Sequence, residues 1–198
     1  TDGLALQAIK LVFENLESSV KNADFESREK MHNASTMAGM AFANAFLGMS
    51  HSMAHKIGGF FHTVHGRTNA ILLPYVIRYN GTRPAKAATW PKYNYYKADV
   101  KFQDIAKMLG LPASTPEEAV DALAKAVYDL GERVGIDMSI KGQGVDEKEY
   151  MDTVEEIAYL AYEDQCSPAN PRLPMVADMV EILQDAYYGY KERPGRIK

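Results

Sequence analysis

The sequence predicts an all-α protein, and three observations support this prediction. Apolar residues recur at helical spacing through most of the 198 residues, cap and turn residues separate these stretches, and no segment alternates convincingly between apolar and polar residues as a strand would. The composition, 46% apolar and 24% charged, is that of a globular domain with a substantial core. We therefore expect a single bundle of about seven helices.

The first half of the chain contains the more apolar helices. Asp24, with Glu26 in the following turn, is placed to start a helix whose small and apolar residues continue to Gly48 on all sides, which predicts an interior position. A break at Gly58 and Gly59 separates two further helical stretches. The stretches of this half cover residues 4–20, 24–48, a short segment that ends at 58–59, and 65–79.

The second half begins with an irregular segment, residues 82–96, in which Trp90, Tyr93, Tyr95 and Tyr96 predict an exposed aromatic patch. Capping signals are clearer beyond it. Thr115 followed by Pro116 and Glu118, and Asp146 followed by Glu149, are both typical of helix starts. The predicted helices of this half cover residues 98–109, 116–135, 146–166 and 175–188, with a proline-rich loop over 167–174.

Charge and cysteine content exclude several classes of function. A net charge of -4 provides no basic patch for nucleic acid. Residues 31–55 contain no charged side chain, but a membrane span there would bury Asn33, Asn44 and His51 in lipid, so we expect a buried helix and no membrane partner. The single cysteine, Cys166, favours a reducing cytoplasmic location. A start at Thr1, without Met or a signal peptide, suggests a segment of a longer protein.

Four of the five histidines, His51, His55, His62 and His65, fall between residues 51 and 65. Lys56 is the one charged residue nearby, so neutral imidazoles that bind a divalent metal are favoured, although hydrogen-bonded core histidines would also fit. Spacing alone nominates His51 with His55, because they share a helix face. The pair lacks the glutamate that serves as general base in a metalloprotease motif, which argues against a metalloprotease. Histidine and carboxylate ligands suit both Fe(II) and Zn(II), and the sequence does not choose between the two metals.

Longer motifs then add a resemblance. The segment Gly48-Met-Ser-His-Ser-Met-Ala-His-Lys-Ile-Gly58, followed by His65-Gly66 and by Asn-Ala-Ile-Leu-Leu-Pro over 69–74, resembles the signature of the iron-dependent (group III) alcohol dehydrogenases. Matching residues continue at 1–9, 41–45, 164–166 and 170–172. Among these enzymes the chain is most similar to the alcohol dehydrogenase part of the bifunctional aldehyde-alcohol dehydrogenases.

The resemblance implies that residues 1–198 form the C-terminal helical domain of a two-domain dehydrogenase whose α/β nucleotide-binding domain is absent. His51 and His65 would be two metal ligands, with an Asp and a His from the other domain completing the set. His55 would lie beside the nicotinamide instead of on the metal, as a proton relay or a positioning residue. The residue before the second ligand is often Pro in this family and is Val64 here. The chain has no Gly-rich phosphate-binding turn, so it should not bind NAD(H) alone.

The implied reaction interconverts a short-chain aldehyde and a primary alcohol, such as acetaldehyde and ethanol, with NAD(H) and with Fe(II) or Zn(II). Phe42 and Cys166 would wall the substrate pocket, although both also fit as ordinary core residues. His62 would lie next to the ligands, and Arg172 would tie its loop to a helix end or a carboxylate. Relatives form filaments, so we expect a homo-oligomer or filament. The alternatives are an assembly module that is inactive alone, and a stand-alone iron dehydrogenase for longer alcohols or diols.

Overall fold

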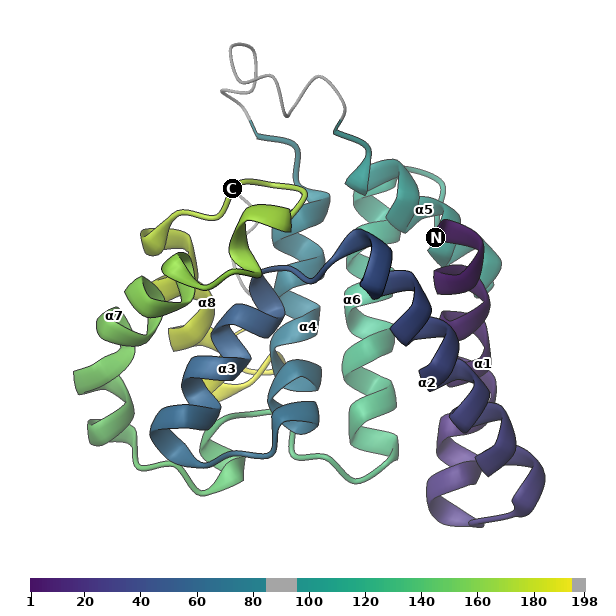
Figure 1. Ribbon diagram of the computed structural model, residues 1–198, viewed down its shortest axis with the longest axis horizontal. Coiled ribbons are helices and arrows are strands. Elements are labelled where there is room, and N and C mark those ends of the chain that lie inside the picture. Colours follow the sequence, from purple (N-terminus) through teal and green to yellow (C-terminus); the bar gives the residue numbers. More distant parts are fainter. Residues whose placement is uncertain (85–95, 194–198) are drawn as a thin grey trace.

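The computed structural model describes residues 1–84 and 96–193, and its elements are helical, as predicted (Figure 1). No strand occurs within these two ranges. The α-helices are α1 (Asp2–Lys21), α2 (Phe25–Ala45), α3 (Met49–Phe61), α4 (His65–Gly81), α5 (Ala98–Met108), α6 (Pro116–Arg133), α7 (Glu147–Glu163) and α8 (Val176–Tyr188), with short 3₁₀ turns at Lys141–Gln143 and Ser167–Ala169. The count exceeds the expected number because the short stretch before Gly58 and Gly59 is a full helix, α3. The expected break at these two glycines was wrong, since α3 continues through them to Phe61.

A core of buried side chains lies where α3, α4, α6, α7 and α8 meet. Two buried tyrosines belong to it: the rings of Tyr150 and Tyr187 are 5.0 Å apart, and their hydroxyls donate to the backbone carbonyls of Leu183 and Val145. Burying a phenol is favourable only when its hydroxyl finds such an acceptor. The largest apolar side chains of the core are Met49, Met53, Ile57, Ile71, Leu72, Ile140, Ile157, Met179 and Leu183.

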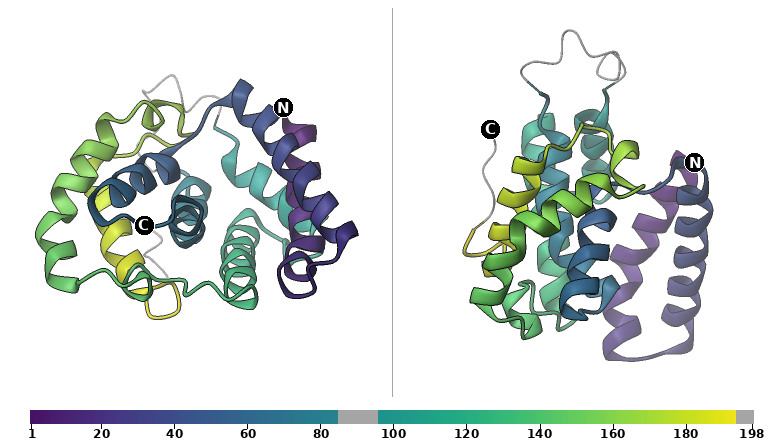
Figure 2. Two further views of the ribbon diagram at one scale, coloured as in Figure 1. Left: turned by 60° about the horizontal axis from the view of Figure 1, so that its bottom comes forward. Right: turned by 60° about the vertical axis from the view of Figure 1, so that its left-hand side comes forward.

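Helix α2 is not interior, so that prediction was wrong. It pairs with α1 in a hairpin that lies at one edge of the molecule in both views of Figure 2. Only Ser27, Ala34 and Ala41 are buried on α2, and their spacing of seven residues forms one narrow stripe of small side chains that lets two helices approach closely. Phe25 is 84% exposed. The absence of charged side chains from residues 31–45 therefore did not indicate a buried helix.

The boundaries of two helices also differ from the prediction. Helix α2 ends at Ala45 because Phe46 adopts a positive φ of 64°, and Gly48 then becomes the N-cap of α3. Helix α7 ends at Glu163, before Cys166, because Asp164 leaves the helical conformation. These two helix ends place residues of the candidate site.

The other expectations concern the irregular segment and the membrane. Tyr96 is buried and its hydroxyl donates to the carbonyl of Asn80, so it is not part of an exposed patch. Trp90, Tyr93 and Tyr95 lie outside the described residues. Among the helices in the described part of the chain, none combines the length and the apolar character needed to cross a bilayer.

Candidate metal and active site

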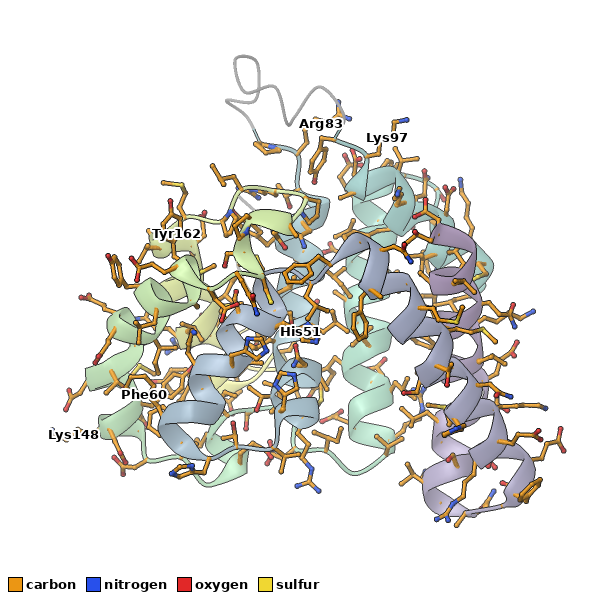
Figure 3. All side chains as sticks on the ribbon, in the orientation of Figure 1. His51, Phe60, Arg83, Lys97, Lys148 and Tyr162 are labelled. Carbon is orange, nitrogen blue, oxygen red and sulfur yellow. The ribbon has the colours of Figure 1, made fainter. Side chains whose placement is uncertain are left out.

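Helices α3 and α4 bring three histidine rings together. His51 lies in the first turn of α3, His55 one turn later, and His65 is the first residue of α4. The ring centroids are 5.4 Å apart for His51 and His65, 6.2 Å for His51 and His55, and 5.2 Å for His55 and His65. Figure 3 labels His51 at the centre of the view, where α3 and α4 lie beside each other. The three imidazoles thus form one cluster.

The chain connection explains how His65 reaches this cluster. His62 ends α3 in the left-handed conformation, with φ 55° and ψ 29°, and Thr63 and Val64 then lead directly into α4. The Thr63 and Thr68 hydroxyls are hydrogen bonded at 2.8 Å across this connection. Among the described residues, His62 is exposed and takes no part in the ring contacts, so it does not join the other three.

A series of hydrogen bonds between side chains holds His65 in place. The Asn69 amide donates to His65 Nε2 at 3.1 Å and to the His65 carbonyl at 3.2 Å, and the Ser50 hydroxyl donates to Asn69 Oδ1 at 3.0 Å. Ser50 precedes His51, so these bonds join α3 to α4 at the two rings. A role for Asn69 was not predicted from the sequence, although its position four residues after His65, on the same helix face, was the available signal.

The environment of His51 favours the neutral ring. Burial lowers the pKa of His51, and the neighbouring His65 and His55 lower it further, because a charged imidazole there would lose hydration and meet two other rings. A neutral imidazole keeps a lone pair for a metal. His51 and His65, whose ring centroids are 5.4 Å apart, are therefore placed to supply two of the ligands of a borderline-soft divalent cation.

Asp164 lies beside His55, although 109 positions separate them in the chain. Its carboxylate accepts from Lys56 Nζ at 2.9 Å, from His55 Nδ1 at 3.3 Å and from the backbone N–H of Cys166 at 3.0 Å. Burial alone would raise the pKa of Asp164, but these three hydrogen bonds outweigh it and hold the pKa far below its ordinary range. Asp164 is thus an anion at every pH at which the protein would work.

Cys166 is buried next to this carboxylate. Its burial and the negative charge of Asp164 raise the pKa of the thiol to about 11. Ligand atoms of His55, Asp164 and Cys166 lie within 4.8 Å of one another, as a metal site would require. The Lys56 ammonium, however, already neutralises the carboxylate, and the thiol is protonated at neutral pH. We interpret these residues as a hydrogen-bonded cluster.

Two further residues singled out in the sequence have clear positions. Phe42 lies on α2 and is 47% exposed, which excludes the core alternative for this side chain. Arg172 donates to the carbonyls of Tyr79 and Thr82 at the end of α4, and its guanidinium lies 4.1 Å from the centroid of the Tyr79 ring. The expectation that Arg172 ties its loop to a helix end is confirmed.

Comparison with known proteins identifies relatives over the whole chain. Residues 1–187 match the model of the Fe-containing alcohol dehydrogenase family, C-terminal. The chain is 81% identical over 198 residues to an aldehyde-alcohol dehydrogenase of Streptococcus pneumoniae (serotype 2, strain D39), covering 100% of this chain and 22% of the relative. It is 42% identical over 194 residues to the bifunctional aldehyde-alcohol dehydrogenase AdhE of Escherichia coli K12, covering 96% and 22%.

Solved structures agree with this similarity. An alcohol dehydrogenase from Oenococcus oeni superposes with a TM-score of 0.80 at 34% identity, covering 94% of this chain and 45% of that one. The iron-containing alcohol dehydrogenase from Thermococcus thioreducens gives 0.77 at 36% identity, covering 95% and 44%. The chain therefore spans less than half of these structures and 22% of the two curated relatives above.

Proposed function

The chain belongs to the iron-containing alcohol dehydrogenase family, and from this we propose that residues 1–198 form the helical metal-binding domain of a longer dehydrogenase. The reaction we propose is the interconversion of a short-chain aldehyde and a primary alcohol, acetaldehyde and ethanol, with NAD(H). The observation that carries the proposal is the meeting of His51 and His65, whose ring centroids are 5.4 Å apart.

His51 and His65 would hold Fe(II), or Zn(II), together with ligands from a nucleotide-binding domain. The donor set fits this role, because burial favours the neutral form of His51 and the His65 ring lies 5.4 Å from it, centroid to centroid. When bound, the metal supplies Lewis-acid polarisation of the carbonyl oxygen, and the nicotinamide supplies the hydride. Two imidazoles are half of a four-ligand set, so this chain alone would hold the metal weakly.

His55 would hold or move the proton of the alcohol. Its ring is 36% exposed, lies parallel to His65 with 12° between the planes, and is bonded through Nδ1 to Asp164. This leaves Nε2 as the nitrogen that can face a substrate. We propose that Phe42 and Cys166 line the substrate pocket; the exposure of Phe42 supports contact with something outside the bundle, and Cys166 contributes through its place beside His55 and Asp164.

Metal content of the full-length protein tests the proposal. We expect His51→Ala and His65→Ala each to lose the stoichiometric metal and to lower kcat by at least about 100-fold, since each removes a ligand. His62→Ala is the matched control, because His62 is exposed and comes from the same segment. Retention of full metal content by His51→Ala would sink the assignment.

The substrate is tested separately with ethanol, butanol and a diol. An NADPH-dependent butanol dehydrogenase of Clostridium saccharobutylicum is 40% identical over 189 residues, which keeps longer alcohols as the second candidate. We expect the highest kcat/KM for ethanol. A clear preference for butanol or the diol would change the proposed substrate but would not affect the proposed metal site.

A further inference from the structure

We propose that Asp164 is a positioning residue that fixes both the orientation of the His55 ring and the nitrogen that carries its hydrogen. This role is separate from the proposed metal ligation, because the hydrogen bonds of Asp164 go to His55, Lys56 and Cys166 and not to His51 or His65. The catalytic consequence rests on the proposed function, whereas the geometry of the contact does not.

The carboxylate of Asp164 is itself held rigidly. The backbone N–H of Asp164 donates to the Ala161 carbonyl at 3.2 Å, which fixes the residue at the end of α7. Oδ1 accepts from the Cys166 N–H at 3.0 Å, and the side chain is only 9% exposed. Because both the backbone of Asp164 and its Oδ1 atom are held, the other carboxylate oxygen, Oδ2, points in one direction.

Two neighbouring residues of α3 donate to that oxygen. Lys56 Nζ lies 2.9 Å and His55 Nδ1 lies 3.3 Å from Oδ2. With the Lys56 cation beside it the carboxylate stays ionised, and an ionised carboxylate can only accept hydrogen bonds. The hydrogen must therefore sit on Nδ1 of His55, and in the neutral ring Nε2 is the bare acceptor.

The same contact sets the plane of the ring. His55 is 36% exposed and would otherwise have several rotamers open to it. Anchored at Nδ1, it lies parallel to His65 with 12° between the planes and 5.2 Å between the centroids. Asp164 thus links the end of α7 to α3 and engages Nδ1, so that Nε2 is the nitrogen of His55 left for a substrate.

A simpler alternative is that Asp164 only stabilises the fold through its ion pair with Lys56. Both partners are more than two-thirds buried, so the pair has structural value. Lys56→Met separates the two roles, because it removes the ion pair and leaves the Asp164–His55 hydrogen bond in place. Asp164→Ala removes both, and Asp164→Asn keeps the shape with an amide that donates as well as accepts.

The experiment uses the full-length, metal-loaded protein and has one readout that does not depend on activity. Diethylpyrocarbonate modifies accessible, unprotonated histidine nitrogens, and peptide mass spectrometry gives the rate for each histidine. In Asp164→Ala we expect His55 to react several-fold faster, with the rate of His62 and the metal content unchanged. In Lys56→Met we expect the rate of His55 to stay at the wild-type value.

Kinetics provide the second readout. Loss of a carboxylate that orients a histidine is expected to lower kcat by about 10- to 100-fold with KM for the alcohol nearly unchanged. Added formate, which fits the space left by Asp164→Ala, should restore part of kcat, and Asp164→Asn should give an intermediate kcat. A smaller loss in Lys56→Met completes the expected pattern.

Two results would overturn the inference. One is wild-type reactivity of His55 and wild-type kcat in both Asp164 variants. The other is a Lys56→Met protein that reproduces the full effect of Asp164→Ala, which would assign the effect to the ion pair. Either result leaves the metal content of His51→Ala and His65→Ala as an independent test, so failure of this inference and failure of the proposed function are distinguishable.

Discussion

Asn170, which is 1% exposed, joins three segments of the bundle through one amide group. Its Oδ1 accepts from the Met49 N–H and from the Asn80 amide, both at 3.2 Å, and its Nδ2 donates to Asn80 Oδ1 at 2.7 Å and to the Arg172 carbonyl at 2.6 Å. The start of α3 and the end of α4 are therefore fixed to the loop after α7. A buried amide with all its partners satisfied specifies one arrangement of these helices.

Gly48 shows how tightly Asn170 is packed. A Cβ added to Gly48 would lie 2.8 Å from Asn170 Oδ1, while the backbone of Gly48 is extended and would accept alanine. We therefore expect Gly48→Ala to lower the free energy of unfolding by about 1–3 kcal/mol, because the amide must move away from its partners. Urea denaturation of the wild type and of Gly48→Ala measures this difference in the free energy of unfolding. Gly39→Ala on α2, where an added Cβ meets nothing within 4 Å, is the control and should be neutral or stabilising.

A double-mutant cycle assigns the cost to this contact. Asn170→Ala removes the atom that the new methyl group would strike, so in that background Gly48→Ala should cost less than about 0.5 kcal/mol further. Additive costs would mean that the methyl group acts through something other than Asn170.

At the scale of elements, the helix starts were predictable and some helix ends were not. Asp24, Thr115 and Asp146 were expected to cap helices, and each side chain accepts a hydrogen bond from the backbone N–H three residues later. Both partners of each cap lie within three residues of one another, so the local sequence is enough to predict these helix starts. The end of α7 depends instead on Asp164, whose carboxylate is held by His55 and Lys56 from a distant part of the chain, and α2 ends where Phe46 adopts a positive φ.

Asp24 also makes the stability of α2 depend on pH. Hydrogen bonds from the Ser27 hydroxyl, the Ser27 backbone N–H and the Ser18 hydroxyl lower the pKa of Asp24 from 3.8 to about 2. A group whose pKa is lower in the folded state contributes stability above its unfolded pKa and loses it as the pH falls through the folded pKa. The contribution should be complete above about pH 5 and lost between about pH 4 and pH 2.

Thermal unfolding of the chain across this pH range tests the cap. Asp24→Ala should have a lower Tm than the wild type above pH 5, and the difference should shrink as the pH approaches 2. Glu155→Ala, which removes an exposed carboxylate from α7, is the control for a general change of charge. A Tm difference that is the same at pH 6 and pH 2.5 would argue against this role of the ionised cap.

At the scale of the whole molecule, the α1–α2 hairpin and the remaining helices differ in how they are held. The hairpin packs chiefly within itself, and α1 contacts α6 at the edge of the bundle (Figure 2). Met40, Phe42 and Phe46 of this segment are all exposed, whereas α3 and α4 contribute many fully buried side chains. An element with little apolar surface buried against the rest should open locally at a lower free energy.

Hydrogen exchange measured by mass spectrometry tests this difference. Peptides from α1 and α2 should exchange at least about tenfold faster than peptides from α3 and α4, which corresponds to about 1.4 kcal/mol in opening free energy. Helix α8, which belongs to the core, serves as a second reference. Equal protection of the hairpin and the core helices would show that the molecule opens as one unit.

The sequence alone determined the helical class, the positions of the caps and the histidine-rich segment, because each depends on residues close together in the chain. The resemblance to a known family supplied the choice of His51 and His65 over the pair that spacing favoured. Tertiary packing decided what local pattern cannot contain: that α2 lies at an edge, that three imidazoles share one cluster, and that Asp164 meets His55 across 109 positions. Such contacts depend on how whole helices pack, and helix packing is set by the combined surfaces of all of them.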